Sequence, residues 1–143
     1  MAYIQIVNGP NLNLLGRRQP EIYGTTTLDD IIGGLKSQFE PSVEIRHFVS
    51  NHEGALIDTI QTAGFDPECL GIVINAGAYT HTSLAIADAV AAIPVPVVEV
   101  HISNIAAREE IRHRSLITPY AKGIIAGLGT AGYKLAADFL VSE

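Results

Sequence analysis

The sequence predicts an α/β fold built on a parallel β-sheet. Three short apolar runs, at residues 3–7, 70–74 and 95–101, alternate with segments whose apolar side chains recur every three or four positions. Such runs are typical of strands buried on both faces, and their alternation with helices indicates a sheet covered on both sides. The chain is 48% hydrophobic and contains no linker or repeat, so we expect one domain over residues 1–143.

Two helices and one strand are expected between the first and second apolar runs. Apolar side chains at helical spacing predict a helix over residues 28–39, with Thr27 as its N-cap. Alternating apolar residues predict a strand over 43–49. The sequence SNHE at residues 50–53 matches a capping box and predicts a second helix that ends near Ala63.

The second half of the chain continues the same alternation. A helix is predicted over residues 82–93, ended by Pro94. Strands are predicted over 95–101 and 123–126, followed by a last helix over about 131–141. Five strands with intervening helices predict a flavodoxin-like, doubly wound parallel sheet in three layers, with strand order 2-1-3-4-5.

The connection between the first strand and the first helix is unusually long. Connections of about two to six residues are common in α/β units, whereas residues 8–26 separate these two elements. Long ordered loops often close over active sites, and Arg18 and Tyr23 lie in this one. We therefore expect a lid over about residues 16–26; the alternative is a connection without a role.

Charge and cysteine content exclude several classes of protein. The formal net charge of −6 argues against a nucleic-acid-binding protein, which would neutralise phosphates with basic residues. Cys69 is the only cysteine, so no intrachain disulfide or CxxC metal site can form. We see no signal peptide and no apolar run of membrane-spanning length, so we expect a cytoplasmic protein without a membrane partner.

The motif GLGTAG at residues 127–132 matches the GxGxxG pattern of dinucleotide-binding proteins. In those proteins the motif opens a βαβ unit with an acidic residue about 20 positions further on. Only the 11 residues 133–143 follow this motif, so the unit cannot be completed. We therefore predict a tight turn with close helix–strand packing, and no nucleotide cofactor.

Polar side chains gather after three of the predicted strands. Ligands of open α/β sheets bind outside the carboxyl ends of the strands, where these side chains would meet. They are Asn11, Arg18, Tyr23, Asn75, His81, Glu99, His101, Arg108 and Arg112. This mixture suits acid–base chemistry on a small polar anion.

Glu99 and His101 are two residues apart on a predicted strand, so their side chains share a face. A carboxylate beside an imidazole can fix its tautomer and make it a proton donor near neutral pH. One alternative is a metal site with His81 as third ligand, although no fourth ligand is obvious. The other is a histidine held for structural reasons alone.

Tyr23 gains a catalytic interpretation from Arg18, five residues earlier on the same loop. A nearby guanidinium favours the phenolate, which can act as a base; alone, Tyr23 would be interpreted as a surface aromatic. Arg108 and Arg112 are four residues apart, which predicts a short helix with both side chains on one face. The two arginines on that face would then either bind an anion or be solvated without a functional role.

Five motifs, in order along the chain, resemble those of type II 3-dehydroquinate dehydratases. They are NGPNLNLLG at residues 8–16 with Arg18, Tyr23 and Gly24 beyond it, SNHEG at 50–54, NAGAYTHTS at 75–83, EVHISN at 99–104 and REEIR at 108–112. Ile111 stands where the family pattern has phenylalanine, which should alter packing beneath the arginine helix. The resemblance implies a flavodoxin-like fold, a homododecamer built from trimers, and no metal or organic cofactor.

The resemblance also implies dehydration of 3-dehydroquinate to 3-dehydroshikimate, in the shikimate or quinate pathway, by anti elimination through an enolate. Tyr23, kept as phenolate by Arg18, would remove a C2 proton, and His101 would protonate the departing C1 hydroxyl. By the same resemblance, Glu99 would orient His101, and Asn11 and Asn75 would stabilise the enolate. The N–H groups of Ile102 and Ser103 would bind the substrate carboxylate, and His81 and Arg112 would bind its hydroxyls. Asp88 would contact the site of a neighbouring subunit.

The residues alone leave other functions open. One is a non-catalytic flavodoxin-like module that binds a small anion. Residues 8–11 lack both the acidic pair of a receiver domain and the phosphate loop of a flavin protein. A pseudoenzyme would be inactive, and a metal-dependent lyase would lose activity with a chelator.

Overall fold

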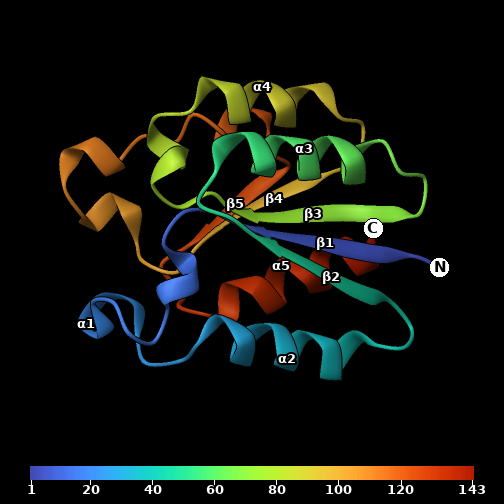
Figure 1. Cartoon of the computed structure of the whole chain (residues 1–143), viewed down its shortest axis with the longest axis horizontal. Helices are drawn as coiled ribbons and strands as arrows, with labels where there is room; N and C mark the ends of the chain where they lie inside the picture. Colours follow the sequence, from blue (N-terminus) through green and yellow to red (C-terminus); the bar gives the residue numbers. More distant parts are fainter.

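The computed structural model describes residues 1–143 and contains a five-stranded parallel sheet between two layers of helices (Figure 1). The strands are β1 (Tyr3–Asn8), β2 (Glu44–Val49), β3 (Cys69–Asn75), β4 (Val97–His101) and β5 (Gly123–Ala126). Their order is β2-β1-β3-β4-β5, and every neighbouring pair is parallel. The predicted fold class and strand order are therefore confirmed.

Two long helices cover each face of the sheet, α2 and α5 on one side and α3 and α4 on the other (Figure 1). The helices are α1 (Pro20–Tyr23), α2 (Leu28–Phe39), α3 (Glu53–Gly64), α4 (Leu84–Ala92) and α5 (Ala131–Ser142), with 3₁₀ turns η1 (Leu12–Leu14), η2 (Gly77–His81), η3 (Ile105–Ala107), η4 (Glu110–Arg112) and η5 (Thr118–Tyr120). Along β1, Ile4 and Ile6 belong to the core under α2 and α5, whereas Val7 belongs to the other core. None of the helices has the length and apolarity to cross a bilayer.

Thr27 caps α2, as predicted, and Asp30 completes a capping box. The Asp30 N–H donates to Thr27 Oγ1 at 3.1 Å, and the Thr27 N–H donates to the Asp30 carboxylate at 3.1 Å. A cap of this kind contributes about 1 kcal/mol to helix stability. The helix that leads away from the long connection therefore has a defined start.

The capping box predicted at residues 50–53 is wrong. α3 begins at Glu53, so Ser50 lies before its N-cap, and Ser50 Oγ accepts the His52 N–H at 3.0 Å. The Glu53 carboxylate instead accepts a hydrogen bond from Ser83. Ser83 is also the N-cap of α4, which explains why this helix begins at Leu84 and not at residue 82.

β4 begins two residues later than predicted, at Val97. Proline has no backbone N–H to donate to the ladder, so Pro96 is poorly suited to the interior of a sheet. The carbonyl oxygen of Pro96 still accepts the Ile72 N–H at 3.0 Å. The early start predicted for this strand is therefore wrong, while its end at His101 is confirmed.

The GLGTAG segment forms the predicted turn between β5 and α5. Gly127 and Gly129 have positive φ angles of 85° and 62°, a conformation that glycine adopts without strain. The Gly129 N–H donates to the Ile102 carbonyl at 3.0 Å. A Cβ added to Gly132 would lie 3.1 Å from Val100 Cγ1, so α5 packs closely on β4. The turn holds in place the segment that follows β4.

Candidate active site

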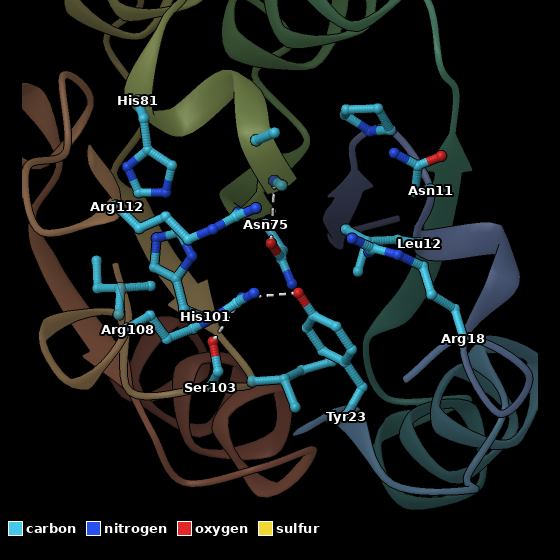
Figure 2. Close-up of a pocket in the computed structure, with 15 residues that line it drawn as sticks. Asn11, Leu12, Arg18, Tyr23, Asn75, His81, His101, Ser103, Arg108 and Arg112 are labelled. Atoms are coloured by element: carbon cyan, nitrogen blue, oxygen red, sulfur yellow. Dashed lines mark hydrogen bonds between the residues drawn. The ribbon is translucent and has the colours of Figure 1, made fainter. Parts of the chain in front are cut away.

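A pocket opens at the carboxyl ends of β1, β3 and β4 (Figure 2). Its lining includes most of the side chains predicted for a site, namely Asn11, Arg18, Tyr23, Asn75, His81, His101, Ile102, Ser103 and Arg112. Two predicted residues lie outside the lining: Glu99 is fully buried behind His101, and Asp88 is exposed on α4. The fold thus brings together residues from three distant parts of the sequence.

Glu99 anchors the rear wall of the pocket, by which we mean Asn75, Glu99 and His101. Glu99 Oε2 accepts hydrogen bonds from His101 Nε2 at 2.5 Å and from Ser115 Oγ at 2.7 Å. Glu99 Oε1 accepts one from Thr118 Oγ1 at 2.5 Å. Burial raises the pKa of the Glu99 carboxyl, but these hydrogen bonds and the nearby His101 outweigh burial and hold the pKa below its ordinary value.

Glu99 is therefore ionised at neutral pH, and it fixes the orientation of the His101 ring. Because Nε2 of His101 is engaged by the carboxylate, Nδ1 is the nitrogen without a protein partner. His101 is 5% exposed, so its imidazole is shielded from bulk water. This arrangement suits a histidine that holds and delivers a proton.

The histidines are not arranged as a metal-ligand set. No group of three or more His, Cys, Asp or Glu residues is placed to hold a metal ion. His81 Nδ1 donates to the Arg114 carbonyl at 2.8 Å, while His101 Nε2 is bound to Glu99. The two imidazole rings stack with their centroids 6.4 Å apart. The geometry favours two hydrogen-bonding histidines.

Tyr23 enters the pocket from α1, on the segment of residues 16–26, which we call the lid segment. Arg18 Cζ lies 5.3 Å and Arg108 Cζ 5.5 Å from the centroid of the Tyr23 ring. Arg108 Nη1 also donates to the Tyr23 hydroxyl at 2.8 Å (Figure 2). The predicted proximity of Arg18 is thus observed, and Arg108 is the arginine that contacts the phenolic oxygen.

The short helix predicted to carry Arg108 and Arg112 is wrong. Arg108 ends η3, and Arg112 belongs to the separate turn η4. Both guanidinium groups nevertheless line the pocket, and Arg112 Nε lies 3.1 Å from a Glu109 carboxylate oxygen. The packing expected for Ile111 beneath such a helix is also wrong, because Ile111 is 73% exposed.

Two backbone N–H groups beyond β4 are available to an anion. Ile102 and Ser103 line the pocket, and neither N–H donates to another group of the protein. The Gly129 N–H holds this segment through the Ile102 carbonyl at 3.0 Å. Successive free N–H groups of this kind form anion-binding concavities, so the segment suits a small carboxylate.

Asn75 and Asn11 present amide groups to the pocket from β3 and from the loop after β1. Asn75 Oδ1 accepts the Gly77 N–H at 3.1 Å, and its Nδ2 donates to Tyr133 Oη at 3.0 Å. Asn11 has a left-handed backbone with φ of 69°, and its N–H donates to Asn51 Oδ1 at 2.9 Å. The Asn11 side chain makes no hydrogen bond within the protein, so it remains available to a ligand.

Three supporting residues were not predicted as part of the site, Ser115, Thr118 and Tyr133, and for Arg108, which was expected at this edge of the sheet, the contact with Tyr23 was not predicted. Arg108 lies within the REEIR motif, and that motif was the signal that could have assigned it. The other three come from segments without a recognisable local pattern. Only the folded chain shows which groups they bind.

The sequence and the fold are shared with proteins of known family. The model of the family described as Dehydroquinase class II matches residues 2–141. The 3-dehydroquinate dehydratase of Bacillus licheniformis is 53% identical over 99% of this chain and 97% of its own length. The catabolic 3-dehydroquinase of Aspergillus clavatus is 52% identical over 94% of this chain and 89% of its own.

A solved structure from the same family has a similar fold. The type II dehydroquinase of Butyrivibrio crossotus is 45% identical and has a TM-score of 0.94, covering 98% of this chain and 97% of that one. Agreement in sequence, fold and coverage over nearly the whole length leaves no part of the domain unaccounted for. The chain belongs to the class II dehydroquinase family.

Proposed function

We propose that this chain dehydrates 3-dehydroquinate to 3-dehydroshikimate, a step of the shikimate pathway or of quinate breakdown. The observation that carries the proposal is a pair of proton-transfer groups in one pocket. Tyr23 is hydrogen-bonded to a guanidinium, and His101 is hydrogen-bonded to a buried carboxylate. The first arrangement suits removal of a proton and the second its delivery. Family membership supports the choice of substrate.

Tyr23 is the proposed base. The guanidinium of Arg108 donates to the phenolic oxygen, and that of Arg18 lies near the ring. A guanidinium that donates to the phenolic oxygen forms a charge-assisted hydrogen bond when that oxygen carries negative charge, which supports the role of base. The phenolate takes a proton from C2, and the electrons of the C2–H bond pass through the adjacent C3 ketone to form an enolate.

Asn75 and Asn11 are the proposed stabilisers of the enolate oxygen. One N–H of Asn75 Nδ2 is used by Tyr133, which leaves the second free. The amide of Asn11 makes no hydrogen bond within the protein. Donors fixed before the reaction stabilise a developing oxyanion without reorganisation at the moment of charge transfer.

His101 is the proposed acid. The enolate collapses to a C1–C2 double bond, and the C1 hydroxyl leaves as water after it takes the proton from His101. The Glu99 carboxylate orients the imidazole through its hydrogen bond to Nε2. Tyr23 and His101 reach the pocket from different elements, one from the lid segment and one from β4 (Figure 2). This placement supports separate groups for proton removal and proton delivery, and the proposed elimination proceeds anti, without a metal or organic cofactor.

The remaining lining groups are proposed to hold the substrate. The free N–H groups of Ile102 and Ser103 suit its carboxylate, and His81 and Arg112 suit its ring hydroxyls. The lid segment, residues 16–26, closes over the bound substrate in this proposal. Gly16 at the start of the segment and Gly24 near its end have φ angles of 89° and 79°, a conformation that glycine adopts without strain.

Self-association into a homododecamer built from trimers, in the cytoplasm, is part of the same proposal. Asp88 is exposed on α4, on the same helix as Leu84, which is 67% exposed. An exposed large apolar side chain beside a carboxylate supports a contact in which Asp88 reaches the site of a neighbouring subunit. Light scattering after size exclusion would test the subunit number, and a monomer would contradict it.

An ultraviolet assay with 3-dehydroquinate tests the proposed function. The product contains a conjugated enone, so absorbance should rise with a chelator present and no cofactor added. Activity that disappears with the chelator would point instead to a metal-dependent lyase. A flat trace from folded protein would contradict the proposal and favour a pseudoenzyme or a small-anion-binding module.

A further inference from the structure

A chain of buried hydrogen bonds runs from the pocket, across β3 and β1, to β2. Asn75 Nδ2 donates to Tyr133 Oη at 3.0 Å, and the Tyr133 hydroxyl donates to Asn8 Oδ1 at 2.6 Å. Asn8 Nδ2 lies 3.1 Å from His47 Nε2. Asn75 is 4% exposed, and Asn8 and Tyr133 are 0% exposed. These four side chains form one connected network, which we call the Tyr133 chain.

The direction of every hydrogen bond in the Tyr133 chain follows from its first member. A backbone N–H can only donate, so Asn75 must direct Oδ1 toward Gly77 and Nδ2 toward Tyr133. Tyr133 then accepts from Asn75 and has one proton to give. That proton goes to Asn8 Oδ1, the nearest acceptor.

The far end of the chain is consistent with this direction. With Oδ1 of Asn8 accepting from Tyr133, Nδ2 of Asn8 is the donor to His47 Nε2. A neutral imidazole is required there, because a protonated Nε2 could not accept. Burial lowers the pKa of His47, which favours the neutral ring at neutral pH. The buried polar atoms of the chain are thus all satisfied.

The Tyr133 hydroxyl has no other task in the structure. Its ring is part of the core under α2 and α5, where a phenylalanine ring would fill nearly the same volume. A buried hydroxyl is costly unless it is hydrogen-bonded, and both partners of this one are asparagine side chains at the ends of β1 and β3. The group is therefore placed to act on those amides.

We propose that Tyr133 is a positioning residue, whose hydroxyl fixes the carboxamide of Asn75 so that its free N–H meets the enolate oxygen. The inference rests on the proposed function, because the enolate is what Asn75 would stabilise. Without the hydroxyl, Asn75 keeps only its bond from Gly77 and can rotate about the terminal torsion. The enolate exists only during the reaction, so turnover should suffer more than substrate binding.

Tyr133→Phe tests this proposal, with Tyr3→Phe as a matched control. Tyr3 is 2% exposed, and its hydroxyl donates to Asp66 at 2.9 Å at the amino end of β1, away from the pocket. Each substitution removes one hydrogen-bonded hydroxyl and keeps a buried ring. Loss of a whole oxyanion donor lowers kcat by about 10²–10³-fold, so we expect a misplaced donor to lower it about 10–100-fold, with KM changed less than about threefold.

The control should keep kcat within about twofold of the wild-type value. Two outcomes would overturn the proposal: Tyr133→Phe with kcat within about twofold of wild type, or Tyr3→Phe with an equal loss. A purely structural effect of Tyr133 would give the second pattern, because each variant loses the hydrogen bonding of a tyrosine whose ring is buried.

A double-mutant cycle separates action through Asn75 from a general loss of stability. If Tyr133 acts through Asn75, then Tyr133→Phe should have little further effect on kcat in an Asn75→Ala background. An equal loss in both backgrounds would contradict the proposal. The cycle uses the same ultraviolet assay as the single variants.

Crystal structures of the wild type and of Tyr133→Phe give a readout that does not need activity. The Asn75 amide should keep one orientation in the wild type and should shift or split into two in the variant. One unchanged Asn75 conformer would overturn the proposal. If the wild type proved inactive on 3-dehydroquinate, the proposed function would fail, while these structures would still decide whether Tyr133 positions Asn75.

Discussion

The rear wall and the lid segment hold the two proposed proton-transfer groups in opposite ways. In the rear wall, Glu99 and His101 are 0% and 5% exposed, and three side chains donate to the Glu99 carboxylate. Both residues belong to β4, a strand in the interior of the sheet. The rear wall is therefore fixed by the same contacts that stabilise the domain.

The lid segment is attached far more weakly. Tyr23 and Arg18 are partly exposed, and a single side-chain hydrogen bond, from Arg108, joins the Tyr23 hydroxyl to the rest of the protein. α1 is only one helical turn long. Few buried contacts make a segment easy to open, which substrate entry requires. In the proposed mechanism the acid is therefore held in place by folding, whereas the base is brought into place when the lid segment closes.

The largest expected effect comes from Tyr23→Phe, which separates chemistry from stability. Loss of a general base lowers turnover by about 10²–10⁴-fold, while the free energy of unfolding should change by less than about 0.5 kcal/mol at a partly exposed site. The ultraviolet assay and urea unfolding measure the two quantities. Tyr120→Phe, at a side chain that is 54% exposed and lines no described pocket, is the control. Near-normal turnover of Tyr23→Phe would sink the assignment of the base.

Glu99→Gln should damage both chemistry and stability, unlike any change in the lid segment. The neutral glutamine side chain cannot accept all three hydrogen bonds that the Glu99 carboxylate accepts. We therefore expect the unfolding free energy to fall by about 1–3 kcal/mol. Loss of His101 orientation should lower kcat by about 10–100-fold. Glu44→Gln, at an exposed carboxylate paired with Arg46, should have little effect on either quantity. A Glu99→Gln protein as stable as wild type would contradict the account of the rear wall.

Arg112→Ala should act on binding more than on chemistry. Arg112 lines the pocket and is proposed to hold a ring hydroxyl of the ground-state substrate, so KM should rise about tenfold with kcat changed less than about threefold. Arg17→Ala is the control, because Arg17 is exposed in the lid segment and does not line the pocket. Unchanged affinity for the substrate in calorimetry would count against this role.

The smallest expected effect is on the pH dependence of the unfolding free energy, to which Glu99 in the rear wall contributes. The folded pKa of Glu99 lies below its ordinary value of 4.5, so the ionised form is favoured by folding. Its contribution to stability is therefore complete above pH 4.5 and is lost as the pH falls through the lower folded value. The unfolding free energy, measured by urea between about pH 3 and 6, should fall less steeply in Glu99→Gln. Parallel curves would contradict the prediction.

The fold was predictable because its signals are local. The apolar runs identify β1, β3 and β4, and Thr27 marks the start of α2 as expected. The alternation of strands and helices then leaves few possible topologies. The error at the start of α3 arose because residues 50–53 fit a capping box in sequence, whereas Glu53 pairs with Ser83, the N-cap of α4, which lies 30 positions away.

The site was predictable as a set of residues but not as a set of contacts. Position near the carboxyl end of a strand was enough to collect Asn75, Glu99 and His101 at one edge. The hydrogen bond between Arg108 and Tyr23 joins residues 85 positions apart, and no local pattern encodes it. Two arginines four residues apart give the same sequence pattern on one helix as on two separate turns. The prediction of one short helix carrying Arg108 and Arg112 was therefore wrong.

Proton exchange at C2 of 3-dehydroquinate in deuterated water tests most directly whether base and acid are separate groups. A His101→Gln variant retains Tyr23 and should exchange the C2 proton, seen as loss of its NMR signal, while forming little product. A Tyr23→Phe variant should do neither above the uncatalysed rate. Exchange by Tyr23→Phe as fast as by His101→Gln would contradict the assignment of the base to the lid segment and the acid to the rear wall.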